Sequence, residues 1–162
     1  MEAKFLTGGD ESVYVQLGDE ISLEVNQKVK DLMHKLEADP VDGIAEMVPT
    51  YATLMIHYKP EKILYAQLVG EIKKRMVETG EKKEEVSQIV KVLPICYDRE
   101  FALDLDECAA FEKVSVEEFI RMHSEHEYYA YMRGVAPGHA YMARFEEPFH
   151  FKRRTEPRVR IN

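Results

Sequence analysis

The sequence predicts an α+β fold in which short antiparallel strands alternate with amphipathic helices. Three observations support this prediction: a hairpin-like start, two stripes of apolar residues with helical spacing, and a pair of β-rich runs between them. With 162 residues, 45% of them hydrophobic and 32% charged, the chain can bury a core and fits one domain or two small ones. We therefore expect a folded, globular protein.

The first two elements are a hairpin and a helix. Apolar residues alternate in segments 5–6 and 13–17 on either side of a Gly-Gly-Asp turn, which predicts two paired strands. Ser22 is a good N-cap for an amphipathic helix, and Asp39-Pro40 marks its end.

The same pattern then repeats with different residues. The β-rich runs 44–48 and 54–58 predict a second antiparallel pair. We place Pro60 at the first position of a second helix that ends at Gly80. The order β-β-α-β-β-α lets both helices pack on one face of a sheet, which predicts a ferredoxin-like α+β sandwich.

A charged run, EKKEE at 81–85, has no apolar member and is a candidate domain boundary, although an exposed helix end would look similar. We divide the chain there into a domain of residues 1–85 and a second of residues 86–162.

The start of the second domain contains three further elements. Segment 89–97 (IVKVLPICY) predicts a strand and segment 105–111 a short helix. Ser115 and Glu118 form a capping-box pattern at the start of another helix.

Charge and composition exclude several classes of partner. The net charge of −8 disfavours nucleic acid and anionic membranes, although residues 152–160 form a basic tail. No apolar run approaches the about 20 residues that span a bilayer, and the N-terminus lacks a signal-peptide pattern, so we expect a cytoplasmic protein. Cys96 and Cys108 fit a reducing compartment and are expected to be small core residues.

Some residue patterns suggest chemistry only weakly. His123 and His126 are three residues apart, but their spacing is not that of a zinc protease, so we expect no metal ion. Ser124 beside His123 lacks a nucleophile elbow. The four carboxylates between residues 100 and 107 offer a general base, although carboxylates at a helix start usually complement the helix dipole.

A glycine turn and a group of arginines are the stronger binding candidates. Gly134 and the Pro137-Gly138 pair would let backbone N–H groups approach an anion or a substrate carbonyl, although such turns are common. A carboxylate or phosphate clamp, or simply a solvated basic tail, is indicated by Arg153, Arg154 and Arg158.

Residues 123–142, HSEHEYYAYMRGVAPGHAYM, resemble the B subunit of bacterial ATP-dependent 5-oxoprolinase, a family also known as allophanate hydrolase subunit 1 or as the inhibitor of the sporulation sensor kinase. The similarity covers nearly the whole chain, including the first domain. The family pattern is matched in this segment by His123, Ser124, Glu127, Tyr128, Tyr131, Gly134, Pro137, Gly138 and Tyr141.

The resemblance has departures as well. Val135 and His139 replace two aromatic positions, and Ala143-Arg144 stand where the family has glycines. The resemblance implies a ferredoxin-like first domain and a cyclophilin-like β-barrel second domain. Because family members continue beyond Asn162, we expect only the first part of that barrel, with unpaired strand edges.

The resemblance also implies a function. The chain would act with a cyclophilin-like protein of the C-subunit type, use ATP as a co-substrate without a tightly bound cofactor, and open the lactam of 5-oxoproline to give glutamate. We expect it to be inactive alone and to be oligomeric. Proton transfer is assigned to His123 and Glu127, and binding of substrate or phosphate to Gly134, Pro137, Gly138, Tyr141, Arg153, Arg154 and Arg158.

Two alternatives remain open. The chain would otherwise be a non-catalytic module that binds a sensor histidine kinase and inhibits it, as members of the family are thought to do. It would then need an exposed apolar surface but no catalytic site. The second alternative is a relative of these proteins without independent activity.

Overall fold

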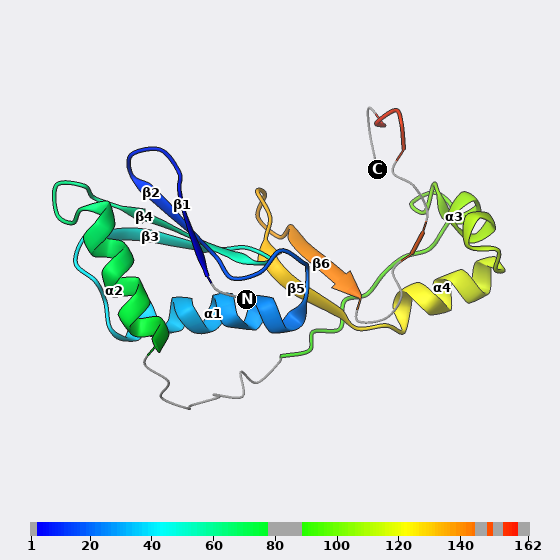
Figure 1. The fold of residues 1–162 in the computed structure, drawn as a ribbon. Helices are drawn as coiled ribbons and strands as arrows, with labels where there is room; N and C mark the ends of the chain where they lie inside the picture. The colour runs from blue at the N-terminus through cyan, green and yellow to red at the C-terminus, as the bar shows by residue number, and fades with distance from the viewer. Residues whose placement is uncertain (1–2, 78–88, 145–148, 151–153, 159–162) are drawn as a thin grey trace. The chain divides into compact units, whose positions relative to one another are not determined.

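The computed structural model describes residues 3–77, 89–144, 149–150 and 154–158. The α+β fold predicted from the sequence is confirmed (Figure 1). In chain order its elements are β1 (Lys4–Thr7), β2 (Ser12–Gln16), α1 (Leu23–Ala38), β3 (Ile44–Pro49), β4 (Thr53–Tyr58), α2 (Tyr65–Val77), α3 (Leu105–Glu112), α4 (Val116–Ser124), β5 (Tyr128–Arg133) and β6 (Ala140–Arg144).

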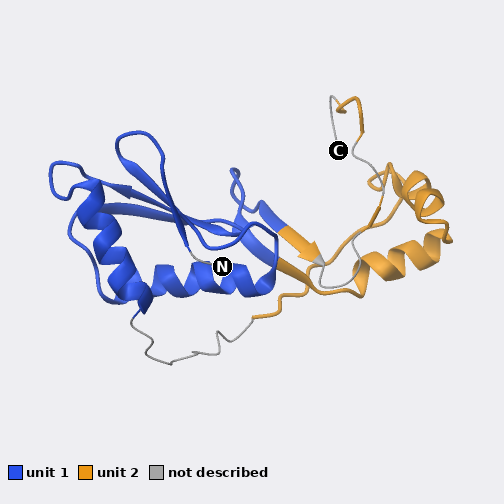
Figure 2. Ribbon diagram, in the orientation of Figure 1, with its two compact units in different colours: residues 1–84, 130–141 blue, residues 85–129, 142–162 orange. Residues whose placement is uncertain are grey.

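The chain divides into two compact units, which Figure 2 shows in different colours. The first contains residues 1–84 and 130–141, and the second contains residues 85–129 and 142–162. Each unit has its own hydrophobic core.

The first unit contains a four-stranded antiparallel sheet with the order β1-β2-β4-β3. Both α1 and α2 cover one face of this sheet (Figure 1). Period-two alternation along β2 and β4 turns one apolar set toward the helices, which is why a single core forms there. Its fully buried apolar residues are Val13, Val15, Val29, Leu36, Leu54, Ile56, Leu68 and Ile72.

Local sequence explains where the first two helices begin and end. The predicted N-cap of α1 is confirmed, because the Ser22 hydroxyl accepts a hydrogen bond from the Val25 amide at 3.2 Å. The prediction for α2 is wrong at its start: Pro60 lies in a turn closed by the Lys62 amide and the Lys59 carbonyl at 2.9 Å. The helix begins only at Tyr65, and its predicted end at Gly80 lies outside the described residues.

The second unit is built on α3 and α4. Their core contains Leu105, Ala109 and Phe119, all buried. The Ser115 hydroxyl caps α4 by accepting a hydrogen bond from the Glu118 amide at 3.1 Å, so that predicted helix start is confirmed.

The prediction of a strand at 89–97 is wrong. Among the described residues this segment pairs with no strand, and Val92 is 92% exposed. A strand needs a neighbour for its backbone groups, and Pro94 offers no N–H donor, so apolar character alone does not make one. Cys96 in this segment is exposed, contrary to the expectation of a core residue, whereas Cys108 is half-buried beside the second core; both thiols are free.

The strands β5 and β6 form a separate two-stranded sheet. Residues 130–141, which include the turn between them, belong to the first unit. Within the described part of the chain, no helix is both long and apolar enough to cross a membrane.

Candidate functional site

The glycine turn predicted from the sequence connects β5 to β6. It is closed by a 2.8 Å hydrogen bond from the Gly134 amide to the His139 carbonyl. Gly138 has a φ of +79°, which side-chain-bearing residues rarely adopt. A Cβ atom on Gly134 would lie 1.9 Å from Cδ2 of His139, so a side chain there would require the His139 ring to move. Pro137 is exposed at the tip of this turn.

Tyr141, which follows the turn, belongs to a group of aromatic side chains in the first unit. Its ring centroid lies 6.2 Å from that of Tyr51 and 5.2 Å from that of His139. The Tyr51 ring in turn lies 5.3 Å from the buried Tyr131. This tyrosine cluster, formed by Tyr51, Tyr131 and Tyr141, therefore joins the loop between β3 and β4 to the β5–β6 hairpin.

A buried amide holds the backbone of the tyrosine cluster. The Asn26 side chain, on α1, donates hydrogen bonds to the carbonyls of Thr50 at 2.9 Å, Tyr51 at 3.3 Å and Tyr131 at 3.4 Å. Its burial is complete, so these bonds replace those that water would make. The sequence did not identify Asn26 or Tyr51 as site residues; a polar residue on the apolar face of a helix was the available signal.

His123 lies at the end of α4 in the second unit, surrounded by aromatic rings. Nδ1 of its ring lies 2.5 Å from the Tyr97 hydroxyl. Phe119 and Phe149 stack on the imidazole at interplanar angles of 12° and 28°. The Tyr128 hydroxyl donates a 3.0 Å hydrogen bond to the His123 carbonyl. The imidazole is therefore held by packing and by a polar contact, as a residue that acts on a ligand would need to be.

Glu127, the second predicted catalytic residue, is exposed in the connection between α4 and β5. Its carboxylate does not bond the His123 ring, so within the described part of the chain the two residues do not form a pair. Tyr97, which the sequence did not identify as a site residue, occupies the position beside the ring.

Two of the predicted arginines meet on one carboxylate. Arg158 contacts both oxygens of Asp104, at 2.5 and 2.6 Å, and Arg154 contacts the same carboxylate at 3.2 Å. The hydrogen bonds from Arg158, followed by the charges of both arginines, lower the pKa of the Asp104 carboxyl. Arg153 lies outside the described residues.

The sequence left open whether these arginines clamp an anion or form a solvated basic tail. The arginines are not simply solvated, because a carboxylate already lies in their fork. Asp104, at the start of α3, makes no side-chain capping bond to that helix, so its contacts go to the arginines instead. Across the described residues, no three or more His, Cys, Asp or Glu side chains gather as a possible metal site.

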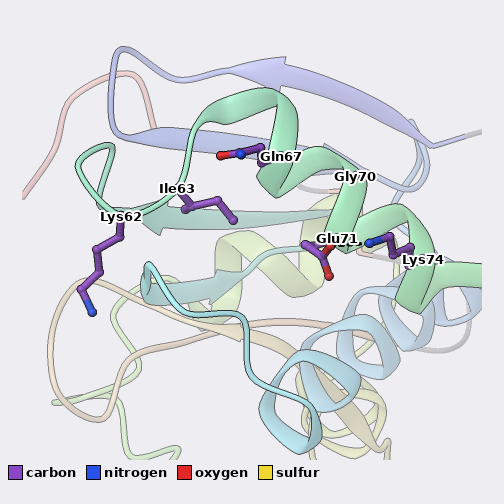
Figure 3. Close-up of a pocket in the computed structure, with 6 residues that line it drawn as sticks. All are labelled: Lys62, Ile63, Gln67, Gly70, Glu71 and Lys74. Carbon is purple, nitrogen blue, oxygen red and sulfur yellow. Dashed lines mark hydrogen bonds and ion pairs between the residues drawn. The ribbon is translucent and has the colours of Figure 1, made fainter.

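A shallow hollow of about 480 Å³ lies elsewhere, along α2 (Figure 3). Its two cations are paired: Lys62 binds Asp42 at 2.8 Å and Lys74 binds Glu71 at 2.5 Å. None of the predicted site residues lines it, and its charges are compensated, so it offers no anion site. The hollow is lined by Lys62, Ile63, Gln67, Gly70, Glu71 and Lys74.

The predicted site residues thus fall into two groups. Gly134, Pro137, Gly138 and Tyr141 lie in the first unit with the tyrosine cluster, and His123, Glu127, Arg154 and Arg158 lie in the second unit.

The geometry defines a class of α+β protein with two hydrophobic cores. One unit holds a buried amide beside the tyrosine cluster, and the other holds a histidine surrounded by aromatic rings. Residues 3–162 match the family described as "Carboxyltransferase domain, subdomain C and D", and the chain belongs to this family.

Known relatives agree with the resemblance drawn from the sequence, which is confirmed. The B subunit of 5-oxoprolinase from Bacillus subtilis (strain 168) is 29% identical over 163 residues, which cover 94% of this chain and 68% of that protein. The crystal structure of TTHA0988 has a TM-score of 0.71 and 27% identity, covering 93% of this chain and 29% of that one. The chain therefore spans less than a third of TTHA0988.

A more distant likeness concerns the fold alone. The K. lactis urea amidolyase structure gives a TM-score of 0.56 at 16% identity, with 80% of this chain covered. The same arrangement of elements is therefore present in a much larger protein, of which this match covers 9%.

Proposed function

We propose that this chain is equivalent to the B subunit of an ATP-dependent 5-oxoprolinase, which hydrolyses the lactam of 5-oxoproline to glutamate together with a C-type subunit. The observation that carries the proposal is the similarity to the 5-oxoprolinase B subunit across 94% of the chain. Family membership over residues 3–162 supports it.

The chemistry explains why ATP would be a co-substrate. An unstrained lactam resists attack by water, and phosphorylation of its oxygen would supply a good leaving group. Arg154 and Arg158, which already hold one carboxylate, have the planar fork that suits a carboxylate or a phosphate. In this proposal the arginines and the Gly134–Gly138 turn bind the anion, and His123 with Glu127 transfers protons, without a tightly bound cofactor.

The proposal includes an arrangement of domains. Residues 1–85 would be a ferredoxin-like domain, in whose compact unit residues 130–141 also lie, and residues 86–162 would belong to a cyclophilin-like barrel. The strand and helix order of the first unit and its helices on one sheet face support the former. We also propose a cytoplasmic location, because two free cysteines fit a reducing compartment.

A surface suited to a protein partner is present in the second unit. Segment 89–95 lies at the surface, and several of its apolar side chains are more than half exposed, including Val92 at 92% and Leu93 at 70%. A group of exposed apolar side chains this close together is typical of interaction sites. We propose that it contacts the C-type partner.

The test is a reconstituted complex. The chain is co-expressed with a 5-oxoprolinase protein of the C-subunit type, complex formation is established by size-exclusion chromatography, and glutamate release from 5-oxoproline is followed with and without ATP. We expect turnover that requires both ATP and the partner. A purified complex without turnover would contradict the enzymatic proposal.

A matched pair of variants then tests the partner surface. Val92→Glu places a charge within the exposed apolar run and should weaken complex formation. Lys91→Glu alters charge at the neighbouring exposed position and should leave the apolar contact in place. Equal binding by both variants would place the interface elsewhere.

The inhibitor alternative stays a prediction. An exposed apolar run would serve a sensor histidine kinase as well as an enzyme complex. The distinguishing measurement is autophosphorylation of a co-purified sensor kinase, which should fall on addition of the chain if this alternative holds, and stay constant if it does not.

A further inference from the structure

The side chains around His123 fix the orientation of its ring as well as its position. Tyr97 approaches it edge-on, at an interplanar angle of 86°, and brings its hydroxyl to 2.5 Å from Nδ1. Phe119 and Phe149 pack in tilted contact with each other, with centroids 5.1 Å apart, while both stack on the imidazole. The ring therefore meets its polar neighbour at Nδ1 in a fixed orientation.

The direction of this hydrogen bond follows from the chemistry of its two groups. A phenol is a stronger acid than a neutral imidazole N–H, and an imidazole nitrogen is a stronger base than a phenol oxygen. Burial also raises the pKa of the Tyr97 phenol, which keeps its proton in place at neutral pH. Tyr97 is therefore the donor and Nδ1 the acceptor.

We propose that Tyr97 is a positioning residue that fixes the tautomer of His123, so that the neutral ring carries its proton on Nε2. With Nδ1 accepting from the phenol, Nε2 is the only ring atom left to bear the proton of the neutral form. Tyr97 acts through His123 and does not touch the substrate itself.

The consequence for chemistry rests on the proposed function. A neutral histidine with its proton on Nε2 is a hydrogen-bond donor at that atom, not a base. In a lactam hydrolase, this donor suits the lactam oxygen, where negative charge develops when the carbonyl is attacked. This inference replaces the proton-transfer role proposed above for His123 with the stabilisation of a developing oxyanion, and it leaves Glu127 as the candidate base.

The tautomer is measured directly on the full chain, without any assay of activity. Long-range ¹H–¹⁵N spectra of the histidine-labelled protein distinguish protonated from unprotonated ring nitrogens, and His123→Gln identifies the signals among the six histidines. The pH is raised until the His123 shifts reach their neutral plateau. We expect protonation on Nε2; protonation on Nδ1 would overturn the proposal.

Two tyrosine variants separate positioning from packing. Tyr97→Phe keeps the ring but removes the hydroxyl, and should shift His123 toward a mixture of tautomers. Tyr128→Phe removes a hydroxyl that bonds the His123 carbonyl and not its ring, and should leave the tautomer unchanged. A Tyr97→Phe protein that folds like the wild type, with the same tautomer as the wild type, would also overturn the proposal.

The reconstituted complex adds a readout tied to function. There, Tyr97→Phe should lower kcat at least several-fold with little change in KM, because the tautomer matters when charge develops on the lactam oxygen. If the wild-type complex has no turnover, the proposed function fails, whereas the tautomer spectra still decide the role of Tyr97.

Discussion

At the scale of single residues, Asn26 shows how a polar side chain organises the candidate site. Its fully buried amide donates to three backbone carbonyls, which belong to the loop after β3 and to β5. Without that donor, the part-buried carbonyls of Thr50 and Tyr51 and the buried carbonyl of Tyr131 would each lose a hydrogen bond. The amide thus positions the backbone of Tyr51 and Tyr131 in the tyrosine cluster.

We predict that Asn26→Leu lowers the free energy of unfolding by about 1–3 kcal/mol, because it removes a fully buried amide that donates to three backbone carbonyls. Urea denaturation followed by circular dichroism measures this change. The matched control is Gln27→Ala on the same helix, where the amide bonds the nearby Asp31 at the surface. A loss for Asn26→Leu no larger than for this control would contradict the structural role of Asn26.

Two glycines should respond in opposite ways to the same substitution. Gly138, with a φ of +79°, is in the left-handed region, so Gly138→Ala should cost about 1–2 kcal/mol. A Cβ on Gly70, inside α2, would meet no atom within 4 Å. Gly70→Ala should therefore stabilise the protein by about 0.5–1 kcal/mol through its higher helix propensity.

Thermal and urea unfolding of both variants would check these signs. Stabilisation by Gly138→Ala would show that the turn adopts a different backbone conformation. Destabilisation by Gly70→Ala would show that the surface of α2 is covered by another group.

At the scale of elements, the carboxylate before α3 anchors a distant segment of the chain. Asp104 binds Arg158, 54 residues away, through both carboxylate oxygens. Bidentate geometry gives such a pair more directional strength than a single contact. Segment 154–158 is thereby attached to the start of α3.

Replacement of this carboxylate should release the segment. We predict that Asp104→Asn makes trypsin cleave several-fold faster after Arg158 and Arg154, as measured by mass spectrometry over time. Asp106→Asn is the control, because Asp106 contacts Arg99 instead. Equal cleavage rates in the two variants would mean that the pairing with Asp104 does not hold the segment.

The same contact has a defined pH dependence. The arginines lower the pKa of Asp104 in the folded state, so its stabilising contribution is present above the ordinary carboxyl pKa and is lost as the pH falls through the lowered value. Because the carboxylate is partly exposed, its contribution to the free energy of unfolding should be less than about 1 kcal/mol. After correction for the intrinsic exchange rate at each pH, the amides of segment 154–158 should therefore lose protection only in acid, below about pH 4.

At the scale of the whole molecule, two separate cores divide the chain in a way that does not follow its order. Tyr131, which comes late in the sequence, is buried in the first unit together with residues 1–84. Phe119, only twelve residues earlier, belongs to the core of the second unit. The division of the molecule is therefore spatial rather than sequential.

This division predicts that two core substitutions have different regional effects. Tyr131→Ala and Phe119→Ala should each cost about 3–5 kcal/mol, because each removes a buried aromatic ring. Hydrogen exchange followed by mass spectrometry should show lost protection in β2, β4 and α1 for the first variant, and in α3 and α4 for the second. The same pattern of lost protection in both variants would show that the two cores unfold as one.

The sequence alone determined most of the local structure. Capping by Ser22 and Ser115, the alternation in β2 and β4 and the helical stripe of α1 all arise from contacts within a few residues, so their signals are visible without a fold. The resemblance to the B subunit of 5-oxoprolinase was also legible in residues 123–142.

Only the tertiary structure decided which distant groups meet. The apolar segment 89–97 looks like a strand but lacks a pairing partner among the described residues, and strand formation depends on that partner. The pairing of Arg158 with Asp104, and of the Asn26 amide with Tyr131, likewise joins positions 54 and 105 residues apart. Spacing along a chain carries no information about such encounters, because they depend on how independently formed elements pack.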